Sequence, residues 1–138
     1  LIVPEQFTID LISYRYDDLH KSDPAPVTVR TNTKVKLTVE FDKNSWDFGT
    51  TNLSEKDLWG WDGDFNNWLI SPNIICETTN GHLIGSGENH EGLSYVVDAG
   101  EQTYQLRAEA RVNENSDWTR LLANEKISGK VIFTLSEL

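Results

Sequence analysis

The chain contains no methionine and a single cysteine, Cys76, among its 138 residues. One cysteine excludes an intrachain disulfide and a cysteine-based metal cluster, so Cys76 is expected to be a small buried hydrophobic residue. No apolar run is long enough to span a bilayer, which argues against membrane insertion. Because the chain begins with Leu1 and lacks methionine, we expect a processed product or an excised segment, and an extracellular or cell-surface location is compatible with it.

Basic residues are also scarce. The chain has 12 lysines and arginines against 22 aspartates and glutamates, which gives a formal net charge of −10. A negative field of this size repels the phosphates of nucleic acid and of anionic lipid headgroups. The expected partners therefore do not include nucleic acid or membrane surfaces, whereas neutral ligands such as sugars and divalent cations remain compatible.

The amount of apolar material predicts one compact domain over residues 1–138. Hydrophobic residues make up 38% of the chain and charged residues 25%, which is enough to build a single core and too little net bias for disorder. No repeat, low-complexity block or linker divides the sequence. The chain is therefore expected to fold as a single unit.

Apolar residues recur at every second position in several short runs. In KVKLTVEF, residues 34–41, Val35, Leu37, Val39 and Phe41 share one face, as expected for a half-buried strand. The same alternation occurs in FTIDL (7–11), VTVR (27–30), TYQLRAEARV (103–112) and KVIFTL (130–135, with Leu135 on its apolar face). The fold class predicted from these runs is all-β, a jelly-roll-like antiparallel β-sandwich of the galactose-binding-domain-like kind.

Turn signals separate the predicted strands. They are Pro24 with Pro26, Asn80-Gly81, Ser86-Gly87, Ala99-Gly100 and Ser128-Gly129. Two short helical turns are also predicted, one from the capping-box pattern between Ser54 and Asp57, the other over residues 117–126.

The segment DLWGWDGDFNNW, residues 57–68, holds three of the five tryptophans in a stretch rich in turn-forming residues. Trp59 and Trp61 could stack on the apolar face of a pyranose, because aromatic rings offer a large rigid surface. The alternative is that these rings plug the open end of the sandwich. The spacing of Asp62, Asp64 and Asn66 suits calcium ligands only weakly, because the full calcium-loop pattern needs a later glycine and glutamate that this segment lacks.

Catalytic motifs find little support. The sequence contains neither HExxH nor a GxSxG nucleophile elbow. A glycosidase pair such as Asp57 with Asp62 has no more support than any other pair among 22 acidic residues. We therefore expect a protein that is not an enzyme.

An extension of the tryptophan-rich segment, WGWDGDFNNWLISPNIICETTNGHLIGSG (59–87), resembles the central part of the LecA-like galactophilic bacterial lectins. The matching positions are Trp59-Gly60, Gly63-Asp64, Pro72, Ile74-Ile75-Cys76, Gly81-His82-Leu83 and a glycine at 85 or 87. Further matches are Gly92-Leu93, Arg111-Val112-Asn113-Glu114 and Ser128-Gly129 before a final strand. The resemblance covers most of residues 34–135 through short elements.

The resemblance implies a jelly-roll sandwich that binds one calcium per subunit and holds a galactoside through that ion. The implied metal ligands are Asn113, Glu114, Asn124 and Glu125, around the loop before the last strand. The sequence departs from the family pattern in this region: Glu114 replaces an aspartate, Lys126-Ile127 separates the second ligand pair from Ser128-Gly129, and the loop is longer. Ser71 also stands where the family has a histidine before its proline. A bound calcium is therefore possible, at an altered and weak site.

The leading hypothesis is a carbohydrate-binding, galactoside-type, lectin-like module that is not an enzyme. Its ligand-binding residues would be Trp59, Trp61, Asp64, Asn113, Glu114 and Asn124, at one end of the sandwich where two loops converge. The alternative is a β-sandwich interaction or spacer module of a larger surface or secreted protein. A small hydrolase is a weaker third possibility. A homo-oligomer is compatible with either of the first two hypotheses.

Overall fold

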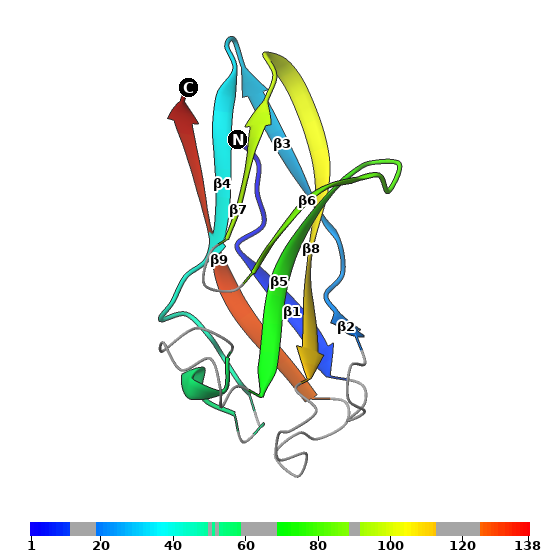
Figure 1. The fold of residues 1–138 in the computed structure, drawn as a ribbon, viewed down its shortest axis with the longest axis vertical. Helices are drawn as coiled ribbons and strands as arrows, with labels where there is room; N and C mark the ends of the chain where they lie inside the picture. Colours follow the sequence, from blue (N-terminus) through cyan, green and yellow to red (C-terminus); the bar gives the residue numbers. More distant parts are fainter. Residues whose placement is uncertain (12–18, 50, 52, 59–68, 89–91, 113–124) are drawn as a thin grey trace.

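The computed structural model describes residues 1–11, 19–49, 51, 53–58, 69–88, 92–112 and 125–138. These residues form β-strands and one short 3-10 turn, η1 (Figure 1). The strands are β1 (Gln6–Leu11), β2 (Leu19–Lys21), β3 (Ala25–Thr31), β4 (Val35–Phe41), β5 (Ile70–Thr78), β6 (Leu83–Glu88), β7 (Leu93–Val97), β8 (Gly100–Val112) and β9 (Glu125–Glu137), and η1 is Glu55–Asp57.

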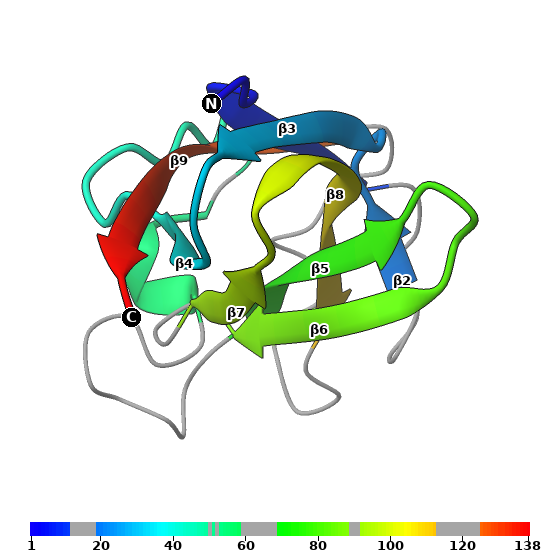
Figure 2. The same cartoon turned by 90° about the horizontal axis from the view of Figure 1, so that it is seen from above.

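Two antiparallel sheets pack face to face. One has the order β1-β9-β4-β7, and the other has the order β2-β8-β5-β6, with β3 following β2 along the same edge of β8. Figure 2, seen along the strands, shows the two sheets on opposite sides of the core. If β2 and β3 are counted as one interrupted strand, this order is that of a jelly roll. The prediction of an all-β, jelly-roll-like sandwich is confirmed.

Alternating side chains build the core between the sheets. In β4, Leu37 and Val39 are fully buried, whereas Lys36 and Glu40 on the other face are exposed. The same pattern runs through the remaining strands, with Ile9, Val27, Val29, Ile74, Cys76, Leu106, Ala108, Ala110 and Ile127 all buried. The run 103–112 is therefore a strand despite its helix-favouring alanines, because the apolar period of two decides which face can be buried.

The predicted turns at Asn80-Gly81 and Ala99-Gly100 are confirmed. Asn80-Gly81 lies between β5 and β6, and Ala99-Gly100 lies where β8 begins after β7. Gly81 and Gly100 have positive φ angles of 82° and 110°. The predicted turns at Ser86-Gly87 and Ser128-Gly129 are wrong, because these pairs lie inside β6 and β9. At Gly129 a Cβ atom would lie 2.9 Å from the Phe41 ring, so this glycine permits close packing inside a strand.

Two further expectations also need correction. Glu125 and Lys126, predicted to end a helical turn, begin β9 instead, because they pair with Leu11 and Asp10 of β1. The rest of that predicted turn lies outside the described residues. Leu135, expected on the buried face of the last strand, is 39% exposed. Among the described strands, this part of β9 has a neighbour on one side only, which is β4, so the apolar face is only partly covered there.

Candidate functional site

The described residues that flank segments 12–18, 59–68 and 113–124 lie at the same end of the sandwich. The start of β5 lies beside the end of β8, because Ile70 pairs with Val112. The end of β1 lies beside the start of β9, because Leu11 pairs with Glu125. These flanking residues are at the bottom of Figure 1, and we call this region the loop end.

The two flanks of segment 59–68 are held together by main-chain contacts. The Leu69 N–H donates to the carbonyl oxygen of Asp57 at 2.7 Å, and Leu58 forms a parallel bridge with Ile70. Leu58, Leu69 and Ile70 are all buried, with exposed fractions of 2% or less. The residues that flank the segment with Trp59 and Trp61 are therefore part of the buried core.

Asp57 stabilises the turn before this segment. Its Oδ2 atom accepts hydrogen bonds from the Ser54 N–H at 2.8 Å and from the Ser54 hydroxyl at 3.4 Å, and the Asp57 N–H donates to the Ser54 carbonyl at 3.0 Å. The predicted capping box is thus confirmed. The Asp57 side chain is 4% exposed, which suits a structural carboxylate better than a glycosidase acid that must reach solvent-borne substrate.

Trp46 belongs to the core. It is 9% exposed, its ring centroid lies 4.8 Å from that of Phe41, and it stacks on Phe48 at 6.2 Å. The main chain next to Trp46 is fixed to β9 by two reciprocal main-chain hydrogen bonds between Asp47 and Ser128, both of 2.8 Å. This packing places Trp46 in the core. It makes Trp46 a reference for the tryptophans of segment 59–68.

The residues predicted to bind sugar, which are Trp59, Trp61, Asp64, Asn113, Glu114 and Asn124, lie outside the described residues. Of the predicted metal ligands, Glu125 is described in its main chain only, as the first residue of β9. The structure pairs Ile70, which follows segment 59–68 after Leu69, with Val112, which precedes segment 113–124. Within the described ranges, no group of three or more His, Cys, Asp or Glu side chains is arranged to hold a metal ion.

A charged network that the sequence did not reveal lies on the outer face of the second sheet. Arg107 of β8 bonds Glu77 of β5, and its Nη2 and Nε atoms donate to Oε1 of Glu109 at 2.7 and 3.1 Å. Partial burial opposes the charge, but the two carboxylates outweigh it and raise the pKa of Arg107. Only the pairing of β5 with β8 brings Glu77 near Arg107, so knowledge of the strand register was needed to find it.

Cys76 has no sign of a reactive thiol. It is fully buried, and burial raises the pKa of its thiol. Burial, together with the neighbouring Cys76, also raises the pKa of Tyr95. A reactive cysteine needs exposure and a lowered pKa, so Cys76 fits the predicted role of a small buried hydrophobic residue.

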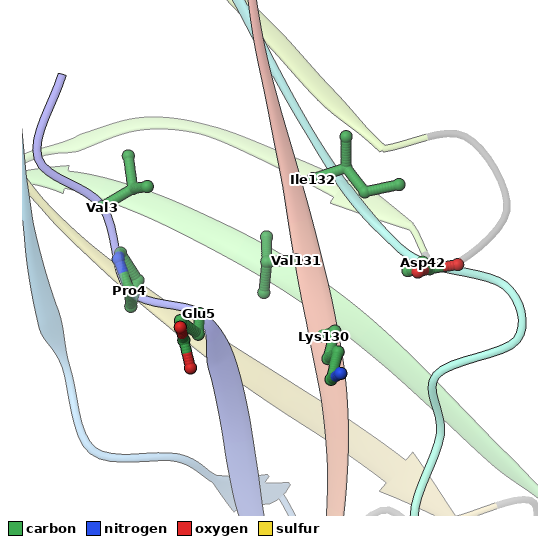
Figure 3. A pocket seen from close by; sticks show the side chains of 7 residues that line it. All are labelled: Val3, Pro4, Glu5, Asp42, Lys130, Val131 and Ile132. Atoms are coloured by element: carbon green, nitrogen blue, oxygen red, sulfur yellow. The ribbon is translucent and has the colours of Figure 1, made fainter.

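Two pockets lined by described residues lie away from the loop end. One, of about 350 Å³, is lined by Val3, Pro4, Glu5, Asp42, Lys130, Val131 and Ile132 (Figure 3). The other, of about 400 Å³, is lined by Arg30, Thr31, Asn32, Gly100 and Glu101 at the opposite end of the sandwich. Neither presents an aromatic ring on which a sugar could stack.

Comparison with known proteins leaves the family open. No protein-family model matches the sequence, and no curated protein matches it. Among solved structures, the chain is similar to a crystal structure of a protein from Sulfurospirillum deleyianum, at 9% identity and a TM-score of 0.36. The similarity covers 96% of this chain and 99% of the other. A similarity at this level supports no inference about function. Among the described residues, no helix is long and apolar enough to cross a membrane.

Proposed function

We propose that the chain is a carbohydrate-binding, galactoside-type, lectin-like module without enzymatic activity, and that the sugar binds at the loop end. The observation that supports this most directly is the pairing of Ile70 with Val112. It ties the end of segment 59–68, with Trp59 and Trp61, to the beginning of segment 113–124. Two segments far apart in the sequence thereby start from neighbouring points.

The residue types of the two segments suit a sugar. Tryptophan rings can stack on the apolar face of a pyranose, while amide and carboxylate oxygens can accept hydrogen bonds from its hydroxyls. A neutral ligand also avoids the repulsion that the net charge of −10 imposes on anions. The resemblance to galactophilic lectins favours a galactoside within this class.

The anchoring of segment 59–68 supports a preorganised site. A binding surface gains affinity when its supporting residues are held rigidly before the ligand arrives. Leu58 and Ile70 are fully buried and bridged to each other, and Leu69 is bonded to Asp57. The flanks of the proposed sugar-binding segment therefore do not need to be ordered by the ligand.

A calcium ion could assist binding through Asn113, Glu114, Asn124 and Glu125. Two amides and two carboxylates supply the hard oxygen ligands that calcium prefers. The departures from the family pattern predict weak affinity, which titration calorimetry would measure. A dissociation constant below about 1 µM, equivalent to roughly −8 kcal/mol, would contradict this prediction.

The decisive experiment is a glycan array probed with and without calcium, followed by affinity measurements on Trp59→Ala and Trp61→Ala. Loss of a stacking ring is expected to weaken sugar binding by ~1 to 2 kcal/mol, roughly 5- to 30-fold in affinity, with little change in stability. We expect this result for at least one of the two variants.

Trp46→Phe is the matched control, because Trp46 packs against Phe41 and Phe48 in the core. It should leave sugar affinity unchanged. If neither loop variant alters sugar binding, or if no glycan binds under either condition, the proposed function is wrong.

A second candidate, an interaction or spacer module, is favoured by exposed apolar side chains away from the loop end. Leu83 and Ile84 of the edge strand β6 are 62% and 37% exposed, and Val96 of β7 is 53% exposed. Such a module would show no thermal stabilisation by any sugar. The same array and melting experiments therefore separate the two candidates.

A further inference from the structure

Among the strands that the structure describes, the upper half of β9, Val131–Glu137, has a neighbour on one side only. β9 pairs with β1 through residues 125–130 and with β4 through residues 131–137. Before β1 begins, the chain turns away from β9, and Ile2 bonds to Thr28 of β3 instead, through two hydrogen bonds of 2.9 Å. Figures 1 and 2 show the red end of β9 at the margin of the molecule, with β4 beside it.

The hydrogen-bond pattern shows which main-chain groups face the open side. The Asp42 N–H donates to the Lys130 carbonyl at 2.8 Å, and the Val131 N–H donates to the Glu5 carbonyl on the opposite side at 3.0 Å. In an antiparallel ladder these directions alternate along the strand. The N–H and C=O groups of Phe133, Leu135 and Glu137 therefore point away from β4, to the side where no described strand lies.

This edge lacks the usual protection against strand pairing. Edge strands are commonly protected by charge, by proline or by a bulge, but residues 131–136, VIFTLS, contain no charge and no proline. Ile132 and Leu135 are 42% and 39% exposed, and Leu138 just beyond the strand is 70% exposed. In a chain with a net charge of −10, this is an uncharged and apolar strip with free hydrogen-bonding groups.

We propose that a second copy of this chain pairs with this edge, antiparallel, so that the two four-stranded sheets become one continuous sheet. The free main-chain groups at Phe133, Leu135 and Glu137 are arranged symmetrically about Leu135. Antiparallel self-pairing therefore places Leu135 opposite the partner's Leu135, and Phe133 opposite the partner's Glu137. A register shifted toward β1 is blocked, because Glu5 already occupies the Val131 N–H.

The pocket in Figure 3 fits the same register. Counting along the paired strands, the partner's Leu138 lies opposite Ile132, which lines this pocket of about 350 Å³ together with Val3, Pro4 and Val131. Directly opposed side chains of an antiparallel pair are in contact distance. The exposed Leu138 of each copy is thereby placed at a pocket of the other, whose lining also includes the charged residues Glu5, Asp42 and Lys130.

The lack of charge on residues 131–136 permits a second copy of this chain to bind at this edge. Two molecules of net charge −10 repel each other, so they can associate only where the contact itself carries little charge. In the proposed register the uncharged run meets itself, and Glu137 faces Phe133 instead of another carboxylate. The symmetric contact limits the assembly to a dimer, because each copy buries its residues 131–137 in the contact and has no second edge of this kind left to pair among its described strands.

This dimer does not depend on sugar binding, since the proposed contact uses residues 131–137 of β9, which run toward the end of the sandwich opposite to the loop end. The test is sedimentation equilibrium from low micromolar to near-millimolar concentration, with the parent chain, Leu135→Lys and Leu135→Glu. The parent should show a monomer–dimer equilibrium. Each single variant should weaken the dimer at least tenfold, because it opposes like charges across the two-fold axis. An equimolar mixture of the two variants should restore the dimer by opposing Lys to Glu.

Val96→Lys is the matched control, because Val96 is also exposed but lies on β7, at the other edge of the same sheet. It should leave the dimer intact. Leu138→Lys, at a position 70% exposed, should weaken the dimer without any effect on folding. A parent chain that stays monomeric throughout, a dimer that survives both Leu135 variants, or a mixture that stays monomeric would each overturn the proposal. Sugar binding by a monomeric variant would show that the proposed function stands apart from this result.

Discussion

Gly87 offers a sharp test of how closely the two sheets approach each other. It lies in β6, opposite Ile74 of β5, with its missing side chain directed inward. A Cβ atom at this position would lie 2.1 Å from the Gly92 carbonyl oxygen and 2.5 Å from the Leu93 nitrogen. Gly87→Ala therefore forces one main chain against another at the step from β6 to β7.

The expected magnitude follows from this overlap. Real Cβ contacts are essentially never shorter than 3.0 Å, so the two main chains must separate by nearly an ångström. Main-chain atoms cannot rotate away as a flexible side chain can. We therefore expect Gly87→Ala to lower the free energy of unfolding by about 3 kcal/mol or more, the upper range for overpacking.

Gly81→Ala is the matched control. Gly81 has a φ of +82°, and nothing lies within 4 Å of its Cβ position, so alanine there meets only the conformational penalty. That penalty is about 1 to 2 kcal/mol. The two variants make the same chemical change and differ only in its physical cause.

Urea unfolding followed by tryptophan fluorescence would measure both variants. The slope with urea should stay constant while the midpoint falls, and the melting temperature of Gly87→Ala should drop by roughly 10 °C or more for a domain of this size. If Gly87→Ala is as stable as Gly81→Ala, the close approach of β6 to Gly92 is wrong.

Three further outcomes are expected. Trp46→Ala should destabilise the fold by ~3 to 5 kcal/mol in urea unfolding, because it removes a buried ring, and a loss below about 1 kcal/mol would contradict its place in the core. Arg107→Met should change stability by no more than about 1 kcal/mol, since its partners are part-exposed; a much larger loss in the same assay would show that the network is a structural core. The raised pKa of Cys76 means that the unfolded chain releases this proton at lower pH than the folded chain. Its contribution is fully present below the ordinary pKa of 9.0 and is lost as pH rises above it, and the raised pKa of Tyr95 adds to this loss. The urea concentration at the unfolding midpoint should therefore be lower at about pH 10 than at about pH 8. An unchanged midpoint would refute this reasoning, and so would rapid labelling of Cys76 in the folded chain by a thiol reagent.

The strands could be predicted from the sequence because the alternation of apolar and polar residues lies within each strand. In β4, successive residues from Val35 to Phe41 face the core and the solvent in turn. A β-strand is the regular structure in which every second residue lies on the same face. The capping box at Ser54 and Asp57 was likewise readable, because both partners lie within one turn of chain. The burial of Cys76 followed from its being a lone small hydrophobic residue within an apolar run.

The candidate site could be predicted from the sequence only in part. Composition and resemblance indicated the segments that we propose to bind sugar, but no local pattern shows that Ile70 and Val112 are neighbours. That contact follows from the pairing of β5 with β8, which are separated in the sequence by β6 and β7. The Arg107 network was missed for the same reason, because Glu77 reaches it only through this pairing.

By itself, the sequence determined which residues face the core, since burial depends on spacing along one strand. Only the tertiary structure decided which strand lies beside which, because that choice depends on contacts between residues far apart in the chain. Ser86-Gly87 shows the difference: a glycine after a serine has the same local signature in a turn as in a strand crossed by another main chain, and only the approach of Gly92 identifies the second case. The open edge of β9 likewise exists because Ile2 pairs with Thr28 and draws the N-terminal residues away, a contact that no local pattern in VIFTLS could encode.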